Sequence, residues 1–196
     1  MNYIAHIHIA QHTDSSLLGN FLGDFVKGSQ LSDYSLKIQH GIKLHRKIDI
    51  YTDQHPEVLN LKKIFPAELQ RTAGIALDIY FDHLLLSNWS RFSTLPVKQL
   101  FTHFYQQLNT TNLQVSEKFL HVRLNLLKHK WLNDYQQEHV CLRAMFSIEQ
   151  RLQGKIIFAS SSYKLLCENR GMIEKSFLRF YAQLLTQSEV LSVKLS

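Results

Sequence analysis

The stretch "LDIYFDHLLL" (Leu77–Leu86) sets three ionisable side chains into a run of large apolar residues. Asp78 and Asp82 are four positions apart, so a helix would place both carboxylates on one face. His83 follows about 100° farther round the helix and can approach the same cleft. Two unpaired carboxylates on an apolar face repel each other and lose hydration, and a bound cation relieves both penalties. The stretch therefore predicts a buried helix with a cation site, and a structural ion pair to an arginine is the alternative.

The segments around this stretch also have the spacing of helices. Residues 66–89 begin with Pro66, and proline is favoured in the first turn of a helix. Apolar residues recur at helical intervals in other segments, which are 14–28, 35–53, 96–110, 117–135 and 175–191. Residues 3–10, "YIAHIHIA", alternate instead as a short strand would. The sequence predicts an all-α fold, an irregular helical bundle formed as a single domain by residues 1–196.

The composition is that of a globular protein, with 45% hydrophobic and 19% charged residues. No apolar run approaches the roughly 18 residues that a membrane-spanning helix needs. The first residues lack the basic region of a secretory signal, and Cys141 and Cys167 are too far apart to form a CxxC pair. We therefore expect a cytoplasmic protein with reduced thiols and no membrane span.

Positive charge is concentrated in the second half of the chain. Residues 1–98 hold 10 Lys and Arg against 9 Asp and Glu, whereas residues 99–196 hold 12 against 7. The net charge of the whole chain is +6. A basic surface favours an acidic partner, which can be a nucleic acid, an anionic lipid or an acidic protein, and charge alone does not choose among them.

A second pair of metal-type side chains repeats the spacing of the first. His45 and Asp49 in "HRKID" are four positions apart and share a helix face. Asp24 lies in a third predicted helix, one turn after Asn20. Mixed histidine and carboxylate ligands suit Mn²⁺, Fe²⁺, Zn²⁺ or Mg²⁺ better than Ca²⁺. Each pair alone is ordinary on a solvated helix, but three predicted helices with such side chains favour a metal site.

The N-terminal segment carries two further histidines, His6 and His8, next to isoleucines. On a helix they lie about 200° apart, so only one of them can face a given site. A lone histidine in an apolar segment is usually a core or surface residue, and a ligand role for His6 is the alternative. The chain has no glycine-rich phosphate loop and no GxSxG or HExxH motif.

Four segments resemble, in order, the motifs of the acyl carrier protein phosphodiesterase family: "MNYIAHIHIA", "SSLLGNFLGDFVKG", "GIKLHRKIDIYTD" and "LDIYFDHLLLSNWS". The segments "KWLNDY" and "FYAQLL" fit the family more loosely. The resemblance implies an all-helical fold related to the HD-type metal-dependent phosphohydrolases. It also implies hydrolysis of the phosphodiester between a serine of holo-acyl carrier protein and 4′-phosphopantetheine, which gives apo-acyl carrier protein. The implied cofactor is a divalent metal, Mn²⁺ first, with Mg²⁺ or Fe²⁺ as alternatives.

The same resemblance points to site residues. It implies that the metal is held by residues among Asp24, His45, Asp49, Asp78, Asp82 and His83. It implies catalytic roles for Asp24, His45, Asp78, Asp82 and His83. One of these acts as general base, or as acid to the departing serine oxygen. This chain has "DH" at residues 82–83, where the HD-type enzymes have "HD", and this order leaves open which side chains bind metal and which transfer a proton.

Basic residues complete the expected site. Arg46 and Lys47 are candidates to offset charge on the phosphate, and both can equally face solvent. A basic helical face is expected to dock the acidic carrier protein, with a solvated face as the alternative: Lys118, Arg123, Lys128 and Lys130. No nucleic-acid partner is expected. Two other functions stay open, an HD-like phosphohydrolase acting on a nucleotide and a non-enzymatic basic helical module that binds nucleic acid or an acidic protein.

Overall fold

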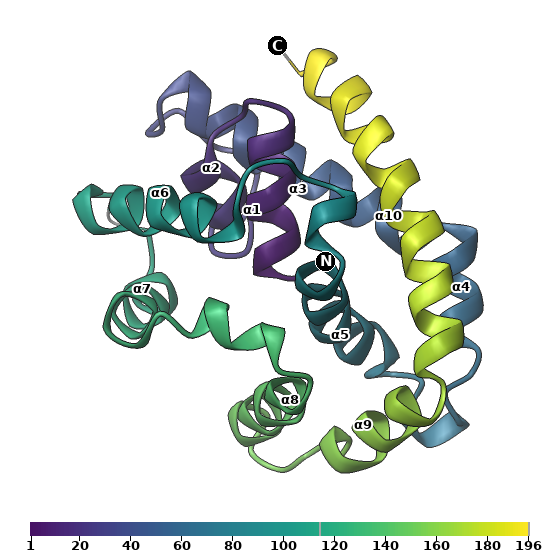
Figure 1. Ribbon diagram of the computed structural model, residues 1–196. Coiled ribbons are helices and arrows are strands. Elements are labelled where there is room, and N and C mark those ends of the chain that lie inside the picture. The colour runs from purple at the N-terminus through teal and green to yellow at the C-terminus, as the bar shows by residue number, and fades with distance from the viewer. Residues whose placement is uncertain (114, 196) are drawn as a thin grey trace.

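Helix α5 (Ala73–Ser87) contains the "LDIYFDHLLL" stretch and lies in the middle of the computed structural model, which describes residues 1–113 and 115–195 (Figure 1). Its buried residues occur on every face of the helix, from Ala73 to Leu86. A helix that is apolar all round is stable only when other elements surround it. Asp82 and His83 of α5 are therefore enclosed with it and need partners inside the protein.

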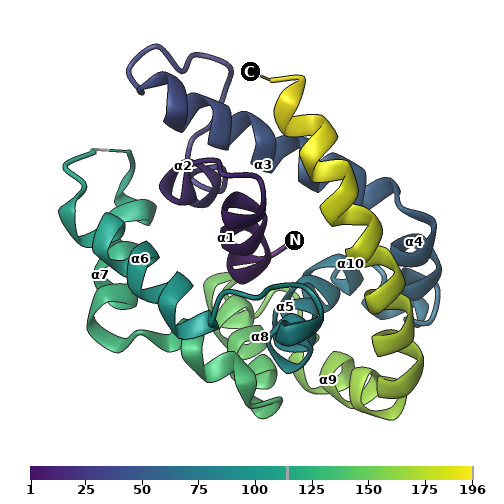
Figure 2. The same ribbon diagram turned by 45° about the horizontal axis from the view of Figure 1, so that its top comes forward.

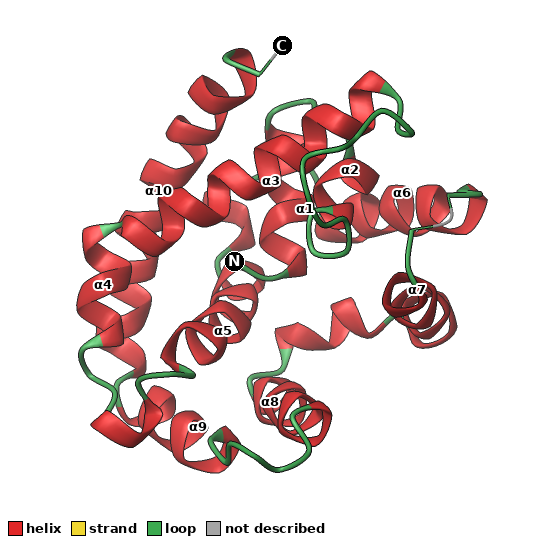
Figure 3. Ribbon diagram, turned by 180° about the vertical axis from the view of Figure 1, so that it is seen from behind, coloured by secondary structure: helices red, strands yellow, loops and turns green. Residues whose placement is uncertain are grey.

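The other elements follow the chain in a simple order. The α-helices are α1 (Tyr3–His12), α2 (Leu17–Leu22), α3 (Leu36–Gln54), α4 (Pro56–Lys62), α6 (Val97–Thr110), α7 (Glu117–His129), α8 (His139–Arg151), α9 (Ala159–Glu168) and α10 (Arg170–Val193). Short 3-10 helices lie between some of them, namely η1 (Ala67–Leu69), η2 (Trp89–Arg91) and η3 (Trp131–Gln136). The described residues contain no strand, so the all-α prediction is confirmed (Figure 3).

Helix α1 is the segment whose alternation resembled a strand. It contacts α2, α5, α6 and α10, and Figure 2 shows it enclosed by the surrounding helices. Its residues from Ile4 to Ala10 are all buried. Because no face of α1 meets water over this length, its histidines and isoleucines need not separate to opposite sides. The alternation therefore gave no information about the type of secondary structure.

Helices α2 and α3 cross with their backbones in direct contact. A Cβ atom on Gly19 would lie 2.7 Å from the carbonyl oxygen of Ile38, and one on Gly41 would lie 2.8 Å from the nitrogen of Asn20. Both positions therefore need glycine. The Ser16 hydroxyl caps α2 by accepting a hydrogen bond from the N–H of Gly19 at 2.9 Å. This crossing holds the residues that follow α2 against the middle of α3.

Helix α10 packs along α4 and against α3 (Figures 1 and 3). Arg179 of α10 donates two hydrogen bonds to the Glu57 carboxylate, at 2.7 and 2.9 Å. Such a bidentate pair fixes direction as well as distance. His55, which caps α4, contacts Gln183 of α10 at 3.0 Å. These contacts hold the end of α3 and the start of α4 in place.

Helices α7 and α8, joined by η3, form the remaining side of the molecule (Figure 1). The expected helix over residues 117–135 is divided at Lys130, whose φ of 50° ends α7 in the left-handed region. The apolar side chains form one buried cluster that extends from Ile4 to Leu185. Among the described residues, no helix is both long enough and apolar enough to span a bilayer.

Candidate metal centre

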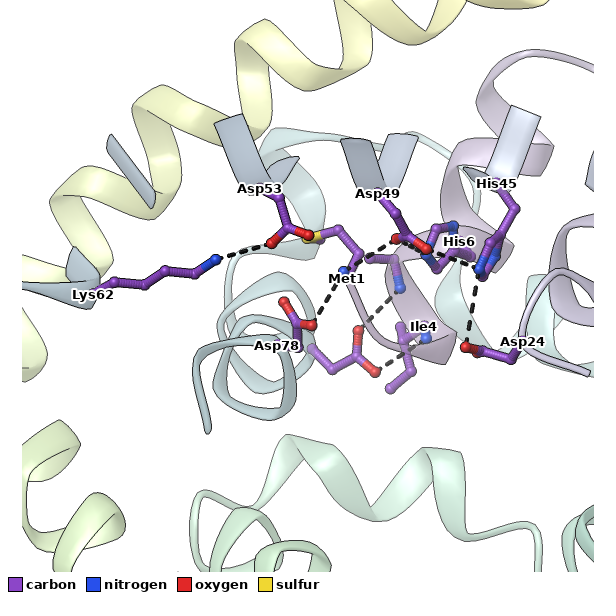
Figure 4. Close-up of polar contacts among 11 residues, drawn as sticks. Met1, Ile4, His6, Asp24, His45, Asp49, Asp53, Lys62 and Asp78 are labelled. Atoms are coloured by element: carbon purple, nitrogen blue, oxygen red, sulfur yellow. Dashed lines mark hydrogen bonds and ion pairs between the residues drawn. The ribbon is translucent and has the colours of Figure 1, made fainter. Parts of the chain in front are cut away.

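Three side chains from two distant segments converge at one point, His6 from α1 and His45 and Asp49 from α3. The Nε2 atom of His6 lies 3.0 Å from Oδ1 of Asp49, and the Nε2 atom of His45 lies 3.1 Å from Oδ2 of the same residue. Figure 4 shows both imidazoles directed at the Asp49 carboxylate. Groups of three or more His, Cys, Asp or Glu residues can hold a metal when their ligand atoms all lie within 4.8 Å of one another. Within residues 1–113 and 115–195, His6, His45 and Asp49 form the only such group.

Asp24 lies at the edge of this group, where the chain leaves α2. Its Oδ1 atom is 3.9 Å from Nε2 of His45. The side chains of Asp24 and Asp49 are 35% and 39% exposed, whereas those of His6 and His45 are 1% and 3% exposed. The imidazoles therefore form the buried floor of the site, and the carboxylates face solvent.

The local sequence explains how these groups come together. The i, i+4 spacing puts His45 and Asp49 on one face of α3. Gly23 lies against the His45 ring so closely that a Cβ atom there would be 2.2 Å from Cγ of His45. The ring of His45 also stacks on the ring of His6, with centroids 3.7 Å apart and planes at 22°. Gly23 therefore lets the chain bring Asp24 up to the two rings.

The environment sets the charge state of the group. Burial and the neighbouring His45 lower the pKa of His6 to about 4, although the hydrogen bond to Asp49 opposes both effects. Burial acts to raise the pKa of Asp49, but hydrogen bonds from His45 and His6 outweigh it and hold that pKa well below its usual range. His6 is thus a neutral imidazole and Asp49 an ionised carboxylate, which are the forms that bind metals.

The donor atoms fit a divalent ion. The Nδ1 atoms of both His6 and His45 are buried without a hydrogen-bond partner, so Nε2 is the nitrogen that each ring offers to the acids. Two imidazole nitrogens with one carboxylate, and a second carboxylate beside them, form a mixed nitrogen and oxygen set. Such a set suits Mn²⁺, Fe²⁺ or Zn²⁺, and its carboxylates also accept Mg²⁺.

Asp78 lies near Asp49, and the amino group of Met1 contacts both carboxylates (Figure 4). The amino group of Met1 lies 3.3 Å from Oδ2 of Asp78 and 3.4 Å from Oδ1 of Asp49. Burial acts to lower the pKa of this amine, but attraction to Asp78 and Asp49 outweighs it and raises the pKa to about 10. Burial raises the pKa of the Asp78 carboxyl. The positive charge that the carboxylate spacing on α5 led us to expect is therefore supplied, at Asp78, by an ammonium group.

Asp82 is directed to the backbone of α1. Its Oδ2 accepts a hydrogen bond from the N–H of Ile4 at 3.1 Å, and its Oδ1 accepts one from the N–H of Ala5 at 3.0 Å. These N–H groups belong to the first turn of α1, which has no partners for them within the helix. Burial raises the pKa of Asp82 to about 7, although both backbone hydrogen bonds oppose this. Asp82 caps α1, and the structure does not bring it into the group around Asp49.

His83 is directed to a different side of α5, toward η3. Its Nδ1–H donates to the carbonyl oxygen of Tyr135 in η3 at 2.8 Å, and its Nε2 lies 3.5 Å from the Ser87 hydroxyl. The side chain is 3% exposed. The two residues of the "DH" pair thus hold two different elements against α5, and neither joins the metal-type cluster.

The two basic residues beside His45 are placed differently from each other. Arg46 donates to the carbonyl oxygens of Gly28 at 2.8 Å and Val26 at 2.7 Å, so its guanidinium holds the segment that follows Asp24. Lys47 is exposed and lies about 200° from His45 around the helix. Neither residue faces the group around Asp49.

The expected basic face on α7 is only partly free. Arg123 donates to the carbonyl oxygens of Leu108 at 2.7 Å and Asn109 at 2.9 Å, which satisfies the end of α6. Lys128 and Lys130 are exposed near the far end of α7. Lys118 is the member of this set that reaches the site.

The ammonium group of Lys118 lies 3.5 Å from the carbonyl oxygen of Asp24. It also lies 5.1 Å from the centroid of the Phe25 ring. A cation is therefore held at the rim of the site, at the backbone of Asp24.

The position of His6 in the site is the feature that the sequence predicted least clearly. Spacing indicated only that His6 and His8 cannot face one site together, and this is what the structure shows. Nδ1 of His8 lies 2.8 Å from the Tyr181 hydroxyl, on the side of α1 that faces α10. The edge of its ring packs on Trp89 with centroids 4.8 Å apart, and burial lowers its pKa to about 4. No sequence signal distinguished the histidine beside α3 from the histidine beside α10.

Comparisons with known proteins identify the family of the chain. The family model described as acyl carrier protein phosphodiesterase matches residues 1–184. A protein named acyl carrier protein phosphodiesterase from Klebsiella pneumoniae (strain 342) is 32% identical over 96% of this chain and 98% of its own length. Proteins of the same name from Enterobacter sp. (strain 638) and Photorhabdus laumondii are each 30% identical over 96% of this chain. No solved structure matches the chain. The chain belongs to the acyl carrier protein phosphodiesterase family.

Proposed function

We propose that this protein hydrolyses the phosphodiester that joins 4′-phosphopantetheine to a serine of holo-acyl carrier protein, releasing apo-acyl carrier protein and 4′-phosphopantetheine. Membership of the family supports the reaction and its substrate. The observation that carries the proposal in this chain is the convergence of His6, His45 and Asp49, with Asp24 at their edge. Buried imidazoles beside partly exposed carboxylates form a site that an anionic phosphodiester approaches only together with a cation.

We assign the metal to His6, His45 and Asp49, with Asp24 as the adjacent carboxylate, and we expect Mn²⁺, with Mg²⁺ or Fe²⁺ as alternatives. A bound divalent ion polarises phosphoryl oxygens and lowers the pKa of a coordinated water. The chain's own part is to hold the four side chains in place. The stacked rings and Gly23 fix the imidazoles, and the hydrogen bonds around Arg46 fix the segment after Asp24.

Two further side chains are placed to help the reaction. Lys118, held beside Asp24, contributes a positive charge where the substrate phosphate enters. Asp78 is 34% exposed, and burial raises its pKa although the Met1 ammonium opposes this, so it holds a proton more readily than a free carboxyl group does. We therefore propose that Asp78 gives a proton to the departing serine oxygen, and that Asp82 and His83 support the site without joining it.

The direct test is conversion of holo-acyl carrier protein to the apo form. Purified protein is freed of metal with a chelator, and each metal is added back before intact-mass analysis of the carrier protein. We expect loss of the phosphopantetheine mass with Mn²⁺ and none with the chelator present. Failure with every divalent metal would exclude the proposed function. Turnover of cyclic or linear nucleotides in a parallel screen would support the alternative HD-like nucleotide phosphohydrolase.

A further inference from the structure

A cavity of about 520 Å³ lies between the start of α1 and the side formed by α7, η3 and α8. Its volume is in the range of about 300–1,000 Å³ that small-molecule sites occupy. About half of the lining residues are apolar or aromatic, among them Tyr3, Val122 and Trp131. The others are polar, and they include Asn125 and Arg143. Apolar surface interspersed with polar groups suits an elongated molecule that has hydrocarbon parts and amides.

Tyr3 links this cavity to the candidate metal centre through its ring contacts. Its ring stacks on Phe25, which follows Asp24, with centroids 6.3 Å apart and planes at 10°. It also lies 6.0 Å from the ring of Trp131 on the cavity wall. His6 is one turn farther along α1, on the same face as Tyr3. A molecule whose end lies at Asp24 can therefore extend along the Tyr3 ring into the cavity.

The electrostatics place Tyr3 between the two regions as well. Burial raises the pKa of the Tyr3 phenol, Asp24 raises it further, and Arg151 lowers it. Asp24 belongs to the metal centre and Arg151 lines the cavity. The phenol therefore lies near enough to Asp24 and to Arg151 for both charges to act on it.

The polar groups of α5 hold the elements that form the cavity. Asp82 caps the start of α1, from which Asn2 and Tyr3 line the cavity. His83 holds η3 through the Tyr135 carbonyl at 2.8 Å. The Tyr80 hydroxyl donates to Oε1 of Glu138, just before α8, at 2.6 Å.

These hydrogen bonds are long-range and are made by groups that burial makes costly to leave unpaired. They fix α1, η3 and α8 around the cavity, so that it is a built feature of the fold. The polar side chains of "LDIYFDHLLL" thus serve the cavity as well as the folding of α5.

We propose that this cavity holds the pantetheine arm of the substrate while the phosphodiester lies at the metal centre. This inference rests on the function proposed above. The arm is an uncharged chain with a geminal dimethyl group, methylene groups and two amides. Its hydrocarbon parts match the apolar walls, and the side chain of Asn125 offers hydrogen bonds to its amides. Binding energy from this non-reacting part of the substrate would position the phosphodiester for attack.

Filling the cavity tests the inference. Ser147 lines the cavity and is exposed, so Ser147→Trp adds bulk there without disturbing the core. The matched control is Gln150→Trp, an exposed position on the same helix that does not line the cavity. We expect Ser147→Trp to raise KM for holo-acyl carrier protein about tenfold or more, and Gln150→Trp to leave it unchanged. Hydrolysis of bis(p-nitrophenyl) phosphate, a phosphodiester without the arm, should be the same in both variants and in the wild type.

A second position and a binding measurement make the result independent of one variant. Ala144→Trp, one turn away on the cavity wall, should reproduce the effect if circular dichroism shows that it folds. D-pantetheine, titrated into metal-free protein by NMR, should shift the Trp131 indole signal in the wild type and in Gln150→Trp, but not in Ser147→Trp. Inorganic phosphate should not produce that shift.

The outcomes separate this inference from the proposed function. Unchanged KM for holo-acyl carrier protein in both cavity variants would overturn the inference, as would the absence of any D-pantetheine shift in the wild type. If the wild type binds D-pantetheine but does not convert holo-acyl carrier protein, the cavity assignment stands and the proposed reaction fails. If neither occurs, both are wrong.

Discussion

Nε2 of His6 lies 3.0 Å from Oδ1 of Asp49, although the two residues are 43 positions apart in the chain. One contact thus joins the buried first helix to the helix that carries the other imidazole of the site. Burial of His6 and ionisation of Asp49 give this contact the protonation states of a metal site. The candidate metal centre therefore depends on the contact between α1 and α3, and the predictions below change residues that form or surround it.

Replacement of His6 should weaken metal binding without unfolding the protein. His6→Gln keeps a polar side chain of similar size but removes the imidazole nitrogen that faces Asp49. We expect Mn²⁺ affinity to fall by at least about 100-fold, measured by isothermal titration calorimetry. His12→Gln is the control, because His12 is on the same helix and pairs with Glu189 at 3.0 Å, away from the site. Equal Mn²⁺ affinity in His6→Gln and the wild type would show that His6 is not a ligand.

Gly23→Ala should disturb the site through one methyl group. A Cβ atom at this position would lie 2.2 Å from Cγ of His45, so the ring has to move. We expect kcat for holo-acyl carrier protein to fall about tenfold or more, because small displacements of site groups are costly. The comparison variant is Gly171→Ala, where an added Cβ meets no atom within 4 Å. Activity equal to that of Gly171→Ala would mean that the position of the His45 ring does not matter.

Asp82→Ala should destabilise the fold, because it leaves the N–H groups of Ile4 and Ala5 without acceptors. We expect the unfolding free energy to fall by about 1–3 kcal/mol in urea denaturation. Asp53→Ala is the surface control, since that side chain is 71% exposed, and it should change stability by less than about 0.5 kcal/mol. From the spacing alone, removal of Asp82 would relieve repulsion with Asp78. A stability gain in Asp82→Ala would favour that view over the capping role.

The same residue predicts a pH dependence. Burial raises the pKa of Asp82 from 3.8 to about 7, so between these values the folded protein holds the proton more tightly than the unfolded chain. The resulting stability is fully present below the unfolded value and is lost as the pH rises through the folded value. Relative to Asp82→Asn, which does not titrate, the wild type should lose on the order of 1 kcal/mol or more between about pH 5 and pH 8. Urea unfolding at several pH values measures the difference, and a difference independent of pH would contradict the shift.

Lys118 should matter for the substrate more than the other lysines of α7. Its ammonium group lies 3.5 Å from the Asp24 carbonyl oxygen, whereas Lys128 is exposed farther along the helix. We expect Lys118→Ala to lower kcat/KM for holo-acyl carrier protein about tenfold and Lys128→Ala to lower it less than about threefold. Steady-state kinetics at constant ionic strength make the comparison. Equal losses in both variants would indicate a diffuse basic surface in place of a specific contact.

The sequence predicted the helical class and the proximity of two residues of the candidate metal centre. Spacing alone put His45 and Asp49 on one face, because an i, i+4 pair is a local property of a helix. The same spacing put Asp78 and Asp82 on one face, but it did not show what each carboxylate meets. The partners of Asp82 are the backbone N–H groups of residues 77 and 78 positions earlier in the chain. A buried helix cap and a metal ligand therefore leave the same local pattern.

The remaining differences arise from tertiary packing. The residues after α2 do not continue the helix, because Gly23 lies against His45 of another helix. The helix expected over residues 117–135 is divided by the left-handed backbone at Lys130, a position without glycine. His6 was not separated from His8, because α1 is buried on all sides and its sequence marks no inner face.

The most direct test of the metal centre is electron spin-echo spectroscopy of the Mn²⁺-loaded protein. The central claim is that His6 and His45 both bind the ion beside Asp49. We expect modulation from two imidazole nitrogens in the wild type, and from one nitrogen in either His6→Gln or His45→Gln. Bound Mn²⁺ without imidazole modulation in the wild type, or modulation unchanged in both variants, would contradict the claim.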